Sequence, residues 1–301
     1  MADNDSVLAA AREWAGSRMA LATVVSTWGS APRPRGSHML VHEDGRFEGS
    51  VSGGCVESDI LAIAAEVIAG APAVLKSYGV GDSAAWEAGL PCGGTIEVLV
   101  QPVSAAGFPP ALFDAIAAAR AQGKPFEVAT DLATGHSGGG DFVNRYDPPR
   151  RLLIVGAVQI AQALAGLARE LGISCTVIDP RARFLTAERF PGVMLDDRWP
   201  DDAVTALRPD PATAVVTLSH DPKIDDPALI AALAAPTGYV AALGSRKSQA
   251  ARLERLTAAG IGPDDLARIE GPAGLDLGAI GPAEIALSIA AAMVKTFHAR
   301  A

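Results

Sequence analysis

Four short apolar runs in the second half of the chain alternate with helix-like stretches, and this alternation restricts the fold more than any other feature. The runs are rich in Val, Ile and Leu and lie at residues 151–155, 173–179, 213–219 and 238–245. The stretches between them carry apolar residues at helical spacing, as in PALIAALAA before the fourth run. Strands that alternate with helices form a parallel sheet covered on both faces. We therefore predict an α/β fold in which residues 151–301 form a doubly wound parallel-sheet domain.

The first half of the chain has the pattern of a mixed α/β domain. The segment SHMLVHEDGRFEGSVS predicts a hairpin that turns at Asp44-Gly45, where a positive φ costs little. Residues 131–150 are rich in Gly, Pro and Asp and show no periodicity, so we interpret them as a linker. The predicted domains are therefore residues 1–130 and 151–301. Further strands and helices are predicted in MALATVVSTW, VESDILAIAAEVIAG, TIEVLVQP and ALFDAIAAARAQG.

Composition excludes several functional classes. A net charge of −9 and an aromatic content of 5% argue against nucleic-acid binding, which requires clustered cations and stacking side chains. No run of about 18 strongly apolar residues is present, so we expect no stable membrane insertion. The N-terminus lacks a basic segment followed by an apolar core, so we expect no secretion signal. Three cysteines do not make a disulfide framework, which favours the reducing cytoplasm.

The segment GSVSGGCVESD, residues 49–59, contains a first cysteine beside paired glycines. Gly53 and Gly54 allow the backbone to turn sharply and give a ligand room to approach the main chain. Cys55 then stands where a helix is predicted to begin, and unpaired amides and the positive end of the helix dipole would favour a thiolate there. The alternative is an ordinary strand-to-helix turn with a small buried cysteine.

The segment GLPCGG, residues 89–94, contains a second such cysteine. Cys92 precedes Gly93 and Gly94, just before a predicted strand. If it faces Cys55, the two thiols could hold a metal or another soft or sulfur-bearing ligand. A zinc site is disfavoured, because the spacing is not Cys-x-x-Cys and no histidine pattern completes four ligands.

The loop between the predicted strand MALATVVSTW and the predicted hairpin is basic. Arg33 and Arg35 alternate with prolines in GSAPRPRG, residues 29–36. Guanidinium groups bind phosphate and carboxylate bidentately, so the two arginines are candidates for holding an anionic ligand. The alternative is a solvated loop without a ligand.

The turn at Gly156 resembles a damaged dinucleotide-binding fingerprint. The full pattern is Gly-x-Gly-x-x-Gly after a strand, and this chain has Val158 and Ala161 at the second and third glycine positions. Asp179 follows about 20 residues later, where an acidic residue would take a ribose hydroxyl. NAD(P) binding at this turn therefore remains an alternative.

Two further loops follow predicted parallel strands. Ligands of such sheets bind outside the carboxyl ends of the strands, so side chains in these loops are candidate ligand contacts. The alternative is a pair of crossover loops with ordinary helix caps. The candidates are His220, Asp221, Lys223, Gly244, Ser245 and Arg246.

These motifs, in this order and spacing, resemble one known family. GSAPRPRGSHMLV, GSVSGGCVESD and GLPCGGTIEVLVQP are similar to the N-terminal motifs of the XdhC/CoxI family. VIDPRARF, LSHDPKIDDPALIAAL and GYVAALGSRKSQAARLERL are similar to its C-terminal Rossmann domain. The resemblance implies a protein that binds molybdenum cofactor (molybdopterin), protects it during sulfuration by a cysteine desulfurase, and delivers it to a molybdenum hydroxylase of the xanthine dehydrogenase type.

The resemblance also implies where the cofactor lies and what the chain is not. Cys55 or Cys92 would lie near the molybdenum, and Arg33 and Arg35 near the phosphate or pterin oxygens. The chain is not expected to be the hydroxylase itself, since three cysteines cannot ligate the two iron–sulfur clusters of that enzyme, which take four each. No catalytic residue is expected. We expect a homodimer. The alternatives are an NAD(P)-dependent oxidoreductase acting on a small substrate and a docking scaffold that never binds cofactor.

Overall fold

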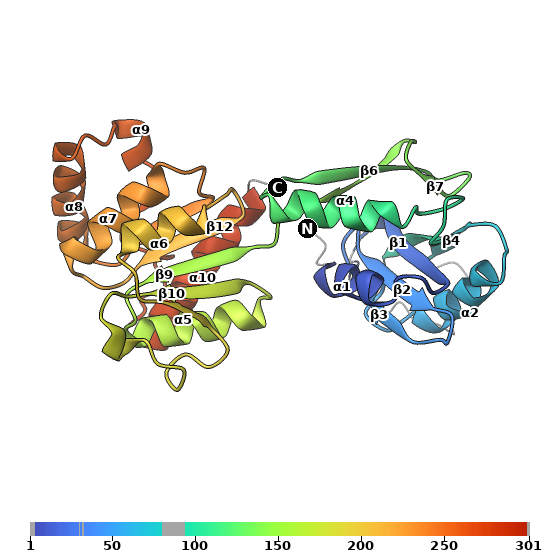
Figure 1. Ribbon diagram of the computed structural model, residues 1–301, viewed down its shortest axis with the longest axis horizontal. Helices are drawn as coiled ribbons and strands as arrows, with labels where there is room; N and C mark the ends of the chain where they lie inside the picture. Colours follow the sequence, from blue (N-terminus) through green and yellow to red (C-terminus); the bar gives the residue numbers. More distant parts are fainter. Residues whose placement is uncertain (1–3, 30, 32, 80–93, 300–301) are drawn as a thin grey trace. The chain divides into compact units, whose positions relative to one another are not determined.

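The computed structural model describes residues 4–29, 31, 33–79 and 94–299 of the 301-residue chain. The chain divides into two compact units, Met1–Pro148 and Pro149–Ala301, and each has its own hydrophobic core (Figure 1). Among the helices that the structure describes, none is both long enough and apolar enough to cross a membrane.

The N-terminal unit is built on a five-stranded antiparallel sheet in the order β3-β2-β1-β5-β4. The side chains of the central strand β1 alternate between the two faces, and both faces are buried because helices cover them. Helix α2 (Glu57–Ile68) packs on one face, while α1 (Asp5–Glu13) and α4 (Ala111–Ala121) contribute to the core on the other. The strands are β1 (Met19–Trp28), β2 (His38–His42), β3 (Phe47–Gly49), β4 (Val74–Tyr78) and β5 (Thr95–Pro102).

A second antiparallel sheet, in the order β7-β6-β8, completes this unit. Its strands are β6 (Phe126–Asp131), β7 (His136–Ser137) and β8 (Phe142–Tyr146), so much of the segment 131–150 is not the linker that we expected. The glycines and polar residues there concealed the two buried positions of β8, Phe142 and Tyr146, which are each 5% exposed. The division of the chain falls instead between Pro148 and Pro149.

The C-terminal unit is the doubly wound parallel sheet that the alternation predicts. Its strand order is β11-β10-β9-β12-β13-β14, and every pair is parallel. The strands are β9 (Arg151–Val155), β10 (Ser174–Ile178), β11 (Met194–Asp196), β12 (Thr213–Thr217), β13 (Tyr239–Ala242) and β14 (Ile269–Glu270). The prediction of the fold class is confirmed.

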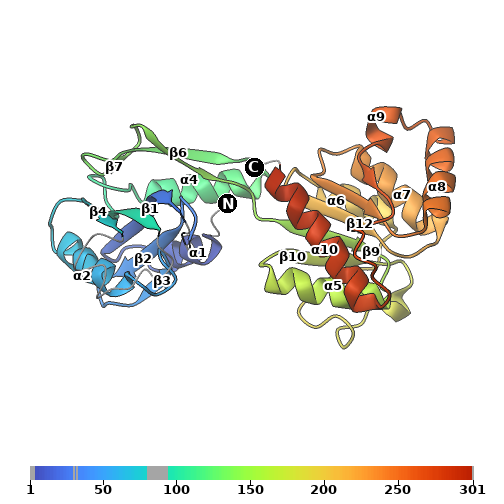
Figure 2. The ribbon, with the colours of Figure 1, turned by 180° about the vertical axis from the view of Figure 1, so that it is seen from behind.

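Helices cover both faces of this sheet. Helices α5 (Gln159–Glu170) and α10 (Pro282–Ala299) lie side by side on one face, as Figure 2 shows, and share one apolar core with it. Helices α6 (Pro200–Leu207), α7 (Pro222–Leu233) and α8 (Arg246–Ala258) cover the other. A 3-10 turn η1 (Ala182–Phe184) and the short helix α9 (Pro263–Leu266) complete the unit. Because all strands are parallel, the loops after β9, β12 and β13 meet at one edge.

Candidate functional site

The loop before α2, residues 50–56, is folded around one buried carboxylate. Glu57 begins α2 and is only 8% exposed. Its Oε1 accepts hydrogen bonds from Ser50 Oγ at 2.6 Å and from the Ser52 amide at 2.9 Å. Its Oε2 accepts from the Gly54 amide at 2.9 Å and from the Ser52 hydroxyl. This one side chain therefore determines the path of the loop.

The same hydrogen bonds keep Glu57 ionised. Burial by itself would raise its pKa, but the hydrogen bonds from Ser50 and Ser52 outweigh burial and lower the pKa to about 2. The carboxylate is therefore charged at neutral pH. Hydrogen bonds to a charged acceptor are stronger than those to a neutral one, so the loop is held firmly.

Cys55 lies within this loop and is half-buried. Its amide and the amide of Val56 each donate to Ser52 Oγ at 2.9 Å. We expected unpaired amides at this position, and that expectation is wrong. Ser52 and Glu57 already take the hydrogen bonds that these amides and the Gly54 amide can make.

The two glycines before Cys55 perform the role that we predicted for the backbone. Gly53 and Gly54 have φ values of 75° and 114°, in the left-handed region that glycine adopts at little cost. Both are exposed, and a Cβ built on Gly54 would meet no heavy atom of the described residues within 4 Å. The backbone at Gly54 is therefore uncrowded by the part of the chain that the structure describes.

The structure separates the two predicted arginines. Arg33 is half-buried, and its Nε donates to the Ser50 carbonyl at 3.3 Å, which brings its charge to the start of the 50–56 loop. Arg35 turns towards the second sheet instead. Its Nε donates to the Val25 carbonyl at 3.2 Å, and its guanidinium lies 4.7 Å from the centre of the Phe142 ring.

The second Gly-Cys motif is described only at its end. Cys92 and Gly93 lie outside the described residues, whereas Gly94 is buried just before β5. The start of β5 and the first turn of α2 lie at the same end of the sheet. Tyr78 pairs with Ile96 on β5, and its hydroxyl donates to Asp59 Oδ2 of α2 at 2.6 Å.

Among the described residues, no group of three or more His, Cys, Asp and Glu side chains could hold a metal ion. The metal role predicted for Cys55 and Cys92 therefore stays a prediction.

At the edge of the C-terminal sheet, the residues that we predicted to bind a dinucleotide make contacts with other residues of this chain. Gly156 has φ 104°, and a Cβ there would lie 2.8 Å from the Ser219 amide nitrogen. Asp179 is fully buried, and its Oδ2 accepts hydrogen bonds from the Ala157 amide and Arg181 Nη2, each at 2.8 Å. Its Oδ1 accepts from the Arg181 amide and Nε, each at 2.9 Å. A ribose hydroxyl would have to displace these donors.

The other predicted residues of this edge cap helices or lie at its surface. Asp221 caps α7 by accepting from the Lys223 amide at 3.0 Å, and Ser245 caps α8 by accepting from the Ser248 amide at 3.1 Å. The backbone at Gly244 has φ 148°. The side chains of His220, Lys223 and Arg246 are exposed.

Sequence reasoning missed two buried charged residues beside these loops. Asp225 is 2% exposed, accepts from Ser219 Oγ at 2.7 Å, and has a pKa raised by burial. Arg252 is 4% exposed, donates to the Leu243 carbonyl at 2.8 Å, and has a pKa lowered by burial. A signal was available for Asp225, which lies in the acid-rich run SHDPKIDD directly after a strand.

Fold and loop together define a two-unit α/β protein with a Rossmann-like unit and a glycine-cysteine loop on a separate antiparallel unit. Two family models match the chain: "XdhC and CoxI family" over residues 14–79 and "XdhC Rossmann domain" over residues 152–293. The chain belongs to the XdhC and CoxI family.

Several relatives match nearly the whole chain. It is 31% identical over 279 residues to the molybdenum cofactor insertion chaperone PaoD of Escherichia coli, covering 90% of this chain and 81% of the relative. It is 27% identical to a probable xanthine dehydrogenase subunit of Bacillus subtilis, covering 92% of each. A crystal structure from Bacillus halodurans, described as a xanthine dehydrogenase, superimposes with a TM-score of 0.79 at 26% identity, covering 100% of this chain and 97% of the other.

Proposed function

We propose that this protein is a carrier of molybdenum cofactor. It binds the cofactor through the 50–56 loop, protects it during sulfuration by a cysteine desulfurase, and delivers it to a molybdenum hydroxylase of the xanthine dehydrogenase type. The observation that carries the proposal is the 31% identity to a relative named as a molybdenum cofactor insertion chaperone, which extends over 90% of this chain.

The residues of the 50–56 loop fit such a cargo. Cys55 offers a soft sulfur ligand, and soft ligands suit a metal already bound by sulfur. No described residue crowds the backbone at Gly54, which supports the approach of a bulky molecule there. Arg33 brings a positive charge to the same loop, which suits the terminal phosphate of the cofactor. The bound cofactor carries the molybdenum that the client enzyme needs, while this chain binds, orients and shields it.

The proposal is tested by loading the protein in a host that makes the cofactor. We expect purified protein to contain molybdenum and oxidisable pterin in near-equal amounts, measured by mass spectrometry and by fluorescence of the oxidised pterin. Replacing both Cys55 and Cys92 by Ser should reduce both signals about tenfold or more, as expected if a bond worth about 1.4 kcal/mol or more is lost.

Cys175→Ser is the matched control, because Cys175 lies on β10 of the other unit. It should retain the parent's cofactor content. Equal content in the Cys55, Cys92 double variant and the parent would exclude an essential thiol. Absence of both signals in the parent, even after free cofactor is added, would refute the carrier function itself.

A further inference from the structure

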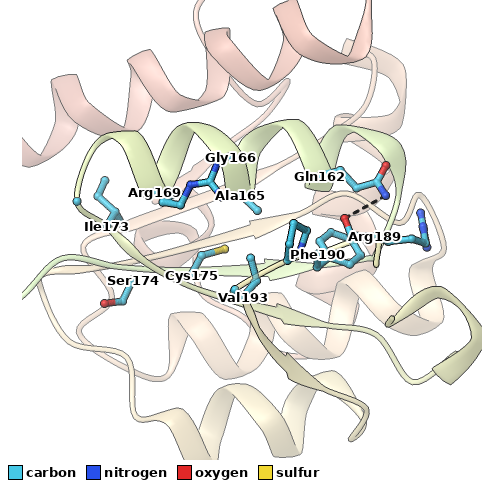
Figure 3. Close-up of a pocket in the computed structure, with 13 residues that line it drawn as sticks. Gln162, Ala165, Gly166, Arg169, Ile173, Ser174, Cys175, Arg189, Phe190 and Val193 are labelled. Atoms are coloured by element: carbon cyan, nitrogen blue, oxygen red, sulfur yellow. Dashed lines mark hydrogen bonds between the residues drawn. The ribbon is translucent and has the colours of Figure 1, made fainter. Parts of the chain in front are cut away.

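A cavity of about 390 Å³ opens on the C-terminal unit between α5 and the segment before β11. We call it the α5 cavity; residues from α5, from the start of β10 and from 189–193 line it (Figure 3). It adjoins the amino-terminal end of β10, whereas the loops that follow β9, β12 and β13 lie at the carboxyl ends of the strands. Its volume lies within the range of small-molecule sites, about 300–1,000 Å³.

The walls of the α5 cavity are apolar in their depth. Cys175 is half-buried and faces the cavity together with Phe190 and Val193 (Figure 3). Burial raises the pKa of Cys175 to about 12, so its thiol stays neutral. The thiol therefore behaves as a small apolar group here, not as a nucleophile.

Gly166 keeps the cavity open. It lies in the interior of α5, where glycine costs about 1 kcal/mol relative to alanine. A Cβ built on Gly166 would meet no heavy atom within 4 Å, so packing within the unit does not require a glycine. Any larger side chain at this position would project into the space that the cavity occupies.

The charged side chains that line the α5 cavity are all positive. None of the 13 residues that line it is Asp or Glu, although the chain carries a net charge of −9. The guanidinium of Arg189 is engaged, since its Nη1 donates to the Phe184 carbonyl at 2.5 Å. Arg169 pairs with Glu170 at 3.7 Å, with side chains 68% and 76% exposed, and such a pair is weak.

We propose that the α5 cavity binds a small organic carboxylate with an apolar body. The carboxylate pairs with Arg169 at the rim, and the apolar body packs against Cys175 and Phe190. A single weakly paired guanidinium suits a monoanion better than a doubly charged phosphate, and it can bind a carboxylate bidentately. The site belongs to the C-terminal unit and is independent of the carrier function.

The test uses the full chain and 1-naphthoate, with neutral 1-naphthamide as the uncharged counterpart. Calorimetric titration should show saturable binding of 1-naphthoate at millimolar concentration and at least tenfold weaker binding of the amide. Arg169→Gln should weaken binding of 1-naphthoate about tenfold, while Arg169→Lys retains part of it. Lys247→Gln, which removes an exposed cation from α8, should change nothing.

The Gly166→Leu variant tests whether 1-naphthoate binds in the α5 cavity. Leucine is the better helix former and fills the cavity, so this variant should melt at a higher temperature than the parent and no longer bind 1-naphthoate. No saturable binding, equal binding of the amide, or unchanged binding by Gly166→Leu would each overturn the proposal.

Discussion

The Glu57 carboxylate accepts hydrogen bonds from donors of the loop before α2. The sequence indicated the neighbouring glycines and Cys55, because paired glycines next to cysteine form a visible motif. It did not indicate Glu57, since an acid in the first turn of a helix is ordinary. Asp179 stands at the spacing of a ribose-binding acid, but only the folded structure reveals that Ala157 and Arg181 donate hydrogen bonds to it.

Removing the Glu57 carboxylate should destabilise the N-terminal unit. Glu57→Ala leaves the buried Val51 and Ser52 amides without this acceptor, and each buried unpaired donor costs about 1–3 kcal/mol. We expect a loss of about 3 kcal/mol in the free energy of unfolding, measured with urea. Glu66→Ala, an exposed position on the same helix, should lose less than about 0.5 kcal/mol. A Glu57→Ala variant as stable as the parent would contradict this role.

Strands β1, β2 and β8 meet at one buried histidine. His38 is 2% exposed; its Nδ1 lies 2.9 Å from Thr23 Oγ1 and its Nε2 lies 2.7 Å from Tyr146 Oη. The sequence predicted β1 and β2, whose apolar runs are long and continuous. It could not predict β8, because Asn144 and Arg145 interrupt the apolar positions, and burial of β8 depends on pairing with β6.

This histidine should make the N-terminal unit acid-sensitive. Burial lowers the pKa of His38 from 6.5 to about 4, so between these values the unfolded chain binds a proton that the folded chain does not. Stability contributed by neutral His38 is therefore complete above pH 6.5 and is lost as the pH falls to about 4, by about 3 kcal/mol.

Urea unfolding at pH 7 and pH 4.5 measures this loss. The difference between the two pH values should be smaller in His38→Gln than in the parent, and unchanged in His136→Gln, which alters an exposed histidine. If His38→Gln does not fold, an NMR titration of the parent gives the same answer. A His38 ring that takes up its proton near pH 6.5 in the folded protein would contradict the prediction.

On the scale of the whole molecule, apolar side chains gather in clusters that stay within one unit. The clusters around Leu152 and Leu153 belong to the C-terminal unit, and those around Ala20 and Leu21 belong to the N-terminal unit. The parallel sheet was predictable because its strands are apolar throughout. The exact boundary was not, because short strands with polar neighbours precede it.

Fragments test the boundary directly. We expect 1–148 and 149–301, expressed separately, each to unfold cooperatively when heated and followed by circular dichroism. A fragment ending at residue 130, the boundary expected from sequence, should not, because it lacks Phe142 and Tyr146 of the core. Cooperative unfolding of 1–130 like that of 1–148 would contradict the assignment of β8 to this unit.

The ion pair of Asp179 and Arg181 has a consequence for any nucleotide that approaches the Gly156 turn. Only one residue separates Arg181 from Asp179 in the chain. Arg181 is therefore a tethered competitor of any ligand that would bind the Asp179 carboxylate. A tethered competitor acts at an effective concentration of about millimolar or higher, whatever the amount of nucleotide outside. A ribose hydroxyl that approaches Asp179 must therefore compete with an arginine of the same chain.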